Sequence, residues 1–209
     1  MNKKLIQQLQ ASPAKLVAVS KKHTKEEVDE LAALGVDTFG ENRVQEFLIK
    51  YDPQYKWHII GHLQTNKVKY LMGKVDLIES VDSLKLAKEI EKQAAKAGIV
   101  QDVLVEIKVS KSDENKTGLP EAELFPLLEE IEKMPHVHVR GLMTIATNTD
   151  DMNLVNSEFA HLKELFEEAK KKYPDFDTLS MGMSHDWPLA IENGATQVRV
   201  GTALFANEE

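Results

Sequence analysis

A single lysine stands at the end of a short apolar stretch near the N-terminus. Residues 16–19 are four apolar residues in a row, and Ser20 and Lys21 follow them. Such a run is typical of a strand buried on both faces. A desolvated lysine has a lowered pKa, and its neutral amine can attack a carbonyl group to form a Schiff base. The alternative, which this stretch alone favours, is that Lys21 extends into water beside Lys22.

Small and hydroxyl-bearing residues near the C-terminus could bind an anion. Residues 181–186 read Met-Gly-Met-Ser-His-Asp, and Gly201-Thr202 follows the last expected strand. Small residues let backbone amides approach an anion, and hydroxyl groups and helix N-termini add donors. These glycines could instead serve only tight turns, and both interpretations stay open here. Combined with a strand-end lysine, an anion site suggests a sugar phosphate bound by an aldolase, or pyridoxal 5′-phosphate (PLP).

The hydrophobic pattern predicts strands that alternate with helices along the whole chain. Expected strands cover residues 16–19, 37–39, 57–60, 76–81, 103–107, 137–142, 178–180 and 197–200. Expected helices lie within 1–15, between Thr24 and Gly35, at 43–49, around 68–72, and at 83–97, 121–133, 153–172 and 187–192, with a loop at 111–118. Thr24 and Glu27 have the spacing of a capping box.

Eight strands separated by helices predict an α/β fold, namely a single (β/α)8 TIM-type barrel. An open doubly wound sheet would use fewer strands and would carry a glycine-rich turn after its first strand, which is absent. No linker rich in proline, glycine or serine divides the chain. We therefore expect one domain over residues 1–209.

The residues at the C-terminal ends of the expected strands are the candidates for chemistry, because barrels of this kind place their sites there. They are Lys21, Asn42, His62, Met143, Ser184 and Arg199. Three of them also have ordinary explanations. Asn42 could cap a helix, Met143 could pack in the core, and His62 could be a histidine bonded to the backbone.

Composition excludes several classes of function. The chain of 209 residues has a net charge of -8 and no basic patch, which argues against a nucleic-acid partner. Its lack of cysteine excludes disulfides and thiolate chemistry. It shows neither a signal-peptide core nor an apolar run of membrane-spanning length, so we expect a cytoplasmic protein. His136 and His138 alternate along a strand, but no third ligand is evident nearby and no metal site is predicted.

Short motifs spread over residues 16–205 carry a resemblance to a known family. They are Leu-Val-Ala-Val-Ser-Lys at 16–21, Phe-Gly-Glu-Asn at 39–42 with Val-Gln-Glu at 44–46, His-Ile-Ile-Gly-His-Leu-Gln-Thr-Asn-Lys at 58–67, Arg-Gly-Leu-Met at 140–143, Leu-Ser-Met-Gly-Met-Ser at 179–184 with Asp186, and Val-Arg-Val-Gly-Thr at 198–202. In this order they resemble the YggS/PROSC family of pyridoxal phosphate homeostasis proteins, whose fold is similar to the barrel domain of alanine racemase.

The resemblance implies a role for each candidate residue. Lys21 would hold PLP as an aldimine, and Arg199 would face the pyridine nitrogen. Phosphate would be bound by Ser184, Gly201 and Thr202, and the cofactor would be lined by Asn42, His62 and Met143.

The resemblance also implies PLP homeostasis without turnover, with PLP-dependent apo-enzymes as possible partners of a monomer. An arginine opposite the ring nitrogen keeps it unprotonated and weakens the electron sink. Racemisation needs a second base, and none of the four tyrosines falls at an expected C-terminal strand end. The alternatives are an amino-acid racemase-like PLP enzyme and a Schiff-base sugar-phosphate aldolase.

Overall fold

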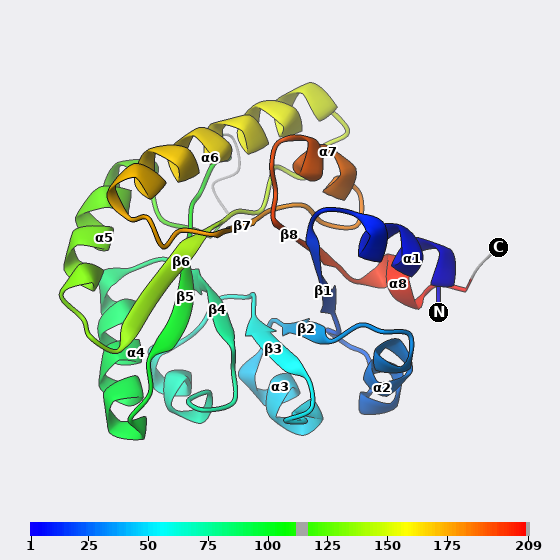
Figure 1. Ribbon diagram of the computed structural model, residues 1–209, viewed down its shortest axis with the longest axis horizontal. Coiled ribbons are helices and arrows are strands. Elements are labelled where there is room, and N and C mark those ends of the chain that lie inside the picture. The colour runs from blue at the N-terminus through cyan, green and yellow to red at the C-terminus, as the bar shows by residue number, and fades with distance from the viewer. Residues whose placement is uncertain (112–116, 208–209) are drawn as a thin grey trace.

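The computed structural model describes residues 1–111 and 117–207 and has a closed barrel of eight parallel strands (Figure 1). Residues 112–116 of the expected loop lie outside the described residues. The barrel closes where β1 pairs with β8, with Leu16 opposite Val198. The strands are β1 (Lys15–Val19), β2 (Thr38–Glu41), β3 (Lys56–Ile59), β4 (Leu77–Val81), β5 (Gln101–Glu106), β6 (Val137–Met143), β7 (Thr178–Ser180) and β8 (Gln197–Val200).

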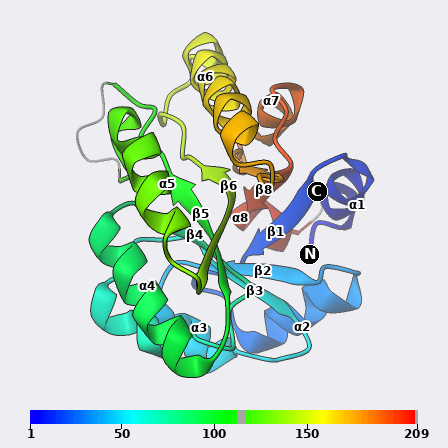
Figure 2. The same ribbon diagram turned by 60° about the vertical axis from the view of Figure 1, so that its left-hand side comes forward.

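Helices surround the barrel on its outside, as Figures 1 and 2 show. The predicted TIM-type barrel is therefore confirmed. The helices are α1 (Lys3–Ala11), α2 (Lys25–Ala33), α3 (Val44–Lys50), α4 (Leu84–Ala97), α5 (Leu124–Glu132), α6 (Met152–Lys172), α7 (Trp187–Glu192) and α8 (Thr202–Phe205), with 3-10 turns η1 (Thr65–Tyr70) and η2 (Glu121–Glu123).

Helix boundaries follow local chemistry. Thr24 and Glu27 form the expected capping box at the start of α2, and Gly98 ends α4 in the left-handed conformation that glycine adopts readily. The helix expected over 121–133 begins only at Leu124, after η2. An α-helix begun at residue 121 would place Pro126 in its interior, where the ring clashes with the carbonyl group four residues earlier.

Alternate residues of each strand face opposite sides of the barrel wall. On β8, Val198 and Val200 belong to the apolar core between barrel and helices, whereas Gln197 and Arg199 hydrogen-bond to Ser180. The barrel therefore buries polar groups as well as a small apolar cluster of Leu77, Leu104 and Met143. Within the described residues, no helix combines the length and apolar character that crossing a bilayer requires.

Candidate functional site

A cavity of about 360 Å³ opens at the C-terminal ends of the strands. All of the predicted site residues except Met143 line it, although they come from loops spread over the whole chain. They are Lys21, Asn42, His62, Ser184, Arg199, Gly201 and Thr202. The residues chosen by their places at strand ends therefore share one site.

Lys21 lies in the turn directly after β1 and is exposed. The hypothesis of a lysine desolvated in the core is therefore wrong for this structure, in which an exposed Lys21 lines the cavity. Lys21 has no ion-pair partner among the described residues. Its neighbour Lys22 adopts a left-handed backbone with φ of 66°, which is uncommon for a residue other than glycine.

The loops that follow β7 and β8 meet at the cavity, next to the end of β1. The Gly201 amide lies 3.4 Å from the Ser184 Oγ, which accepts its hydrogen bond. A Cβ atom at Gly201 would lie 3.1 Å from the Cβ of Val19, so a larger residue would crowd the end of β1. Asp186 shapes the β7 loop by accepting a 2.7 Å hydrogen bond from the Met183 amide. The exposed hydroxyl groups of Ser184 and Thr202 remain at the cavity surface, where an anion can reach them.

Arg199 is the buried cation of the site, with 3% of its surface exposed. Its guanidinium donates to the Ser180 Oγ at 2.6 Å and to the Thr144 carbonyl at 2.7 Å. Burial lowers the pKa of Arg199 from its ordinary value, and the charges of Glu79 and Glu106 oppose that shift. The arginine is thus held in one position in the lining of the cavity.

A chain of buried hydrogen bonds connects Arg199 through Ser180 to Glu79 and His58. The Ser180 hydroxyl donates to Glu79 at 2.5 Å, and the other oxygen of Glu79 lies 2.8 Å from the His58 Nδ1. Burial alone would raise the pKa of Glu79, but the contact with His58 and the charge of Arg199 outweigh it and lower that pKa. Glu79 therefore acts as a buried carboxylate counter-ion.

The structure gives a different outcome for each of the three residues that had ordinary explanations. Asn42 is half-buried at the cavity, and α3 has Arg43 at its N-cap position, so the capping explanation is wrong. His62 is exposed at the cavity mouth rather than buried. Met143 does not line the cavity and packs with Leu77 and Leu104, so its contact with a ligand stays a prediction.

Glu106 lines the cavity but was missed by the sequence reasoning. It ends β5, so the rule that selected the other strand-end residues could have found it. Burial raises the pKa of Glu106, against a 2.7 Å hydrogen bond that the Thr117 hydroxyl donates. Burial likewise raises the pKa of Asp82, which follows β4, while His62 opposes the shift. Glu106 is thus an acidic group in the lining of the cavity, which Asp82 does not line.

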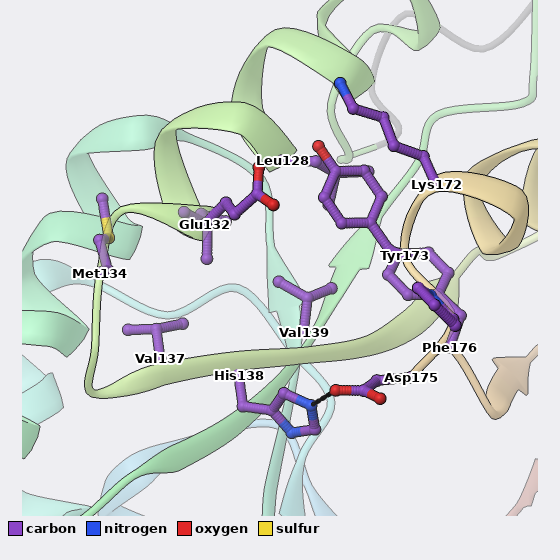
Figure 3. Close-up of a pocket in the computed structure, with 12 residues that line it drawn as sticks. Leu128, Glu132, Met134, Val137, His138, Val139, Lys172, Tyr173, Asp175 and Phe176 are labelled. Carbon is purple, nitrogen blue, oxygen red and sulfur yellow. Dashed lines mark hydrogen bonds and ion pairs between the residues drawn. The ribbon is translucent and has the colours of Figure 1, made fainter.

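A second cavity, of about 310 Å³, lies on the outer wall of the barrel (Figure 3). It is lined by the ends of α5 and α6 and by Val137, His138 and Val139 at the start of β6, so it opens far from the C-terminal strand ends. His138 pairs with Asp102 and Asp175. His136 precedes β6 and pairs with Glu91, so the two histidines do not share a site.

Comparison with known proteins agrees with this geometry. The family model for the alanine racemase N-terminal domain matches residues 1–208. A pyridoxal phosphate homeostasis protein of Aquifex aeolicus is 48% identical over 201 residues, covering 94% of this chain and 88% of the relative. The human protein of that name is 39% identical, covering 96% of this chain and 79% of its own length.

Solved structures also match this chain in their fold. PipY of Synechococcus elongatus, solved with PLP bound, superposes with a TM-score of 0.91 and 34% identity over 99% of this chain and all of its own. An alanine racemase of Clostridium difficile matches with a TM-score of 0.81 but 16% identity, which shows the shared fold alone.

Fold and site together define a parallel barrel with a cavity at its C-terminal mouth that is lined by a lysine and by two hydroxyl-bearing loops, of the alanine racemase N-terminal-domain type. Sequence identity with the relatives over nearly the whole chain identifies one family within this class. The chain belongs to the pyridoxal phosphate homeostasis protein family.

Proposed function

We propose that this chain binds PLP in the C-terminal cavity and serves PLP homeostasis, as a carrier that does not turn over amino acids. The observation that carries the proposal is the convergence of Lys21, the buried Arg199 and the Ser184–Gly201 contact on one cavity. The PLP bound to PipY and the names of the relatives support the same ligand.

The residues present fit the chemical groups of PLP. Ser184, Gly201 and Thr202 offer two hydroxyl groups and backbone amides, which suit a phosphate. PLP supplies an aldehyde that condenses with a primary amine, and Lys21 presents such an amine at the same cavity. Arg199 can only donate hydrogen bonds, so it would hold the ring nitrogen unprotonated.

Two features of the chain favour binding over catalysis. An unprotonated ring is a weak electron sink, so carbanion chemistry is disfavoured. None of the four tyrosines, all of which lie in the described part of the chain, lines the cavity. PLP-dependent apo-enzymes would then be the recipients of the cofactor.

Borohydride reduction tests the lysine assignment. Reduction of the PLP-loaded protein, followed by peptide mass analysis, should place the adduct on the peptide that contains Lys21. The Lys21→Ala variant should lose the visible yellow absorbance and keep weaker binding through the phosphate contacts, whereas the matched Lys22→Ala variant should stay yellow. An adduct found only on Lys67 or Lys116 would contradict the assignment. Racemisation of any member of a panel of L-amino acids would contradict the carrier role.

A further inference from the structure

The motif at residues 39–46 contains two glutamates that the proposed site does not use. Glu41 ends β2 and is fully buried, and Glu46 lies on α3 one turn before Lys50. Neither carboxylate lines the cavity. Both nevertheless contact residues next to Lys21, since Glu41 accepts a hydrogen bond from Ser20 and Glu46 accepts one from Lys22.

Lys50 holds the residue before Lys21. Its buried ammonium, 6% exposed, donates to the Ser20 carbonyl and to the Glu41 Oε1, each at 2.7 Å. The Ser20 hydroxyl donates to the same oxygen of Glu41 at 2.7 Å. Burying an ammonium is costly unless it is paired. The buried Lys50 ammonium is paired with Glu41, and it also donates to the backbone carbonyl of Ser20, the residue before Lys21.

Glu46 holds the residue after Lys21. Its Oε2 accepts a 3.1 Å hydrogen bond from the Lys22 amide and lies 3.6 Å from the Lys50 Nζ. The hydrogen bond from Lys22 is the main cause that lowers the pKa of Glu46, so Glu46 is a carboxylate at neutral pH. This contact also fits the left-handed backbone of Lys22, which needs an external partner to persist.

We propose that Glu41, Glu46 and Lys50 form a hydrogen-bonded cradle that fixes the backbone on both sides of Lys21 and so positions its amine for the aldehyde of PLP. In this step the neutral Lys21 Nζ would form a double bond to the aldehyde carbon while the carbon–oxygen double bond breaks, and the oxygen would leave as water with the two protons of the amine. The three residues touch neither the cofactor nor the reacting atoms, so they are positioning residues. The inference rests on the proposed function, because it presumes that Lys21 is the reacting lysine.

The test separates covalent capture from phosphate binding. Glu46→Ala removes the acceptor for the Lys22 amide, and Glu46→Asp keeps the charge but draws it back by one methylene. Glu46→Gln keeps an oxygen at the same reach. The matched control is Glu30→Ala, which removes an exposed glutamate from α2. Covalent capture is followed by yellow absorbance and by the borohydride adduct on Lys21. Phosphate binding is measured with pyridoxine 5′-phosphate, which carries an alcohol in place of the aldehyde.

Glu46→Ala and Glu46→Asp should form the adduct about tenfold more slowly, since the loss of one hydrogen bond changes an equilibrium constant by up to about tenfold. Their affinity for pyridoxine 5′-phosphate should stay within about twofold of the parent. Glu46→Gln should recover most of the rate, and Glu30→Ala should match the parent.

Unchanged capture in folded Glu46→Ala and Glu46→Asp, with a normal adduct in the parent, would overturn the cradle alone. An equal loss of capture and of pyridoxine 5′-phosphate affinity would also overturn it, because that pattern reports general loosening of the site. A parent protein with no adduct on Lys21 would overturn the lysine assignment, and the cradle with it. Should Glu46→Ala fail to fold, the contrast between Glu46→Asp and Glu46→Gln decides.

Discussion

Arg199 and Glu79 should be energetically coupled, and a double-mutant cycle can measure the coupling. Arg199→Met keeps the length of the side chain but removes two hydrogen bonds from a charged donor, to Ser180 and to the Thr144 carbonyl. At about 1.5 kcal/mol or more each, and with the buried Glu79 losing a nearby positive charge while it keeps its contacts with His58 and Ser180, we expect a loss of about 3–5 kcal/mol in the free energy of unfolding. Glu79→Gln alone should cost about 2–3 kcal/mol, because Arg199 loses a counter-ion.

The double variant should cost about 2 kcal/mol less than the two single losses added together, because a neutral glutamine no longer needs a buried cation. Urea unfolding followed by the fluorescence of the buried Trp57 supplies the free energies. The exposed pair Lys163 and Glu167, 2.7 Å apart, is the matched control and should couple by only about 0.3–0.5 kcal/mol. Additivity of the Arg199 and Glu79 losses within about 0.5 kcal/mol would refute the reasoning.

The coupling between Arg199 and Glu79 should weaken as the pH falls into the acid range. The pKa of Glu79 is lower in the folded state than its usual value. Its stabilising contribution is therefore complete above the unfolded-state value of about 4.3 and is lost as the pH falls through the lower folded-state value. The coupling should persist at pH 6 and disappear only in stronger acid.

Two further predictions concern other parts of the barrel. Because burial raises the pKa of Glu106, the folded state resists its ionisation, and stability is lost as the pH rises from the unfolded-state value through the folded-state value. Glu106→Gln should therefore raise the thermal midpoint at pH 8 and change it little at pH 4, where an equal gain would contradict the burial argument. Thr24→Ala removes the capping box of α2 and should cost about 1 kcal/mol in urea unfolding, whereas an unchanged free energy would show that the cap contributes nothing.

The sequence alone predicted the barrel and most of the residues that line its C-terminal cavity. Apolar periodicity is a local property, so it marked the strands and helices without knowledge of their packing. Parallel strands in a barrel share one mouth, so strand-end residues such as Lys21, His62 and Arg199 could be grouped before any contact was known. The predicted anion edge at Ser184 and Gly201 followed from the same rule.

Only the tertiary structure decided how deeply these residues are buried and which charged groups surround them. The register of β5 against β6 shifts between Val103 and Leu104, and Met143, further along β6, does not line the cavity. Lys50 meets the carbonyl of Ser20, 30 residues away along the chain. Burial and charge pairing depend on such distant partners, so no local pattern could have shown that Lys50, Glu79 and Arg199 are buried ions. The reason is physical: a charge is stable inside a barrel only when groups from other strands and helices surround it.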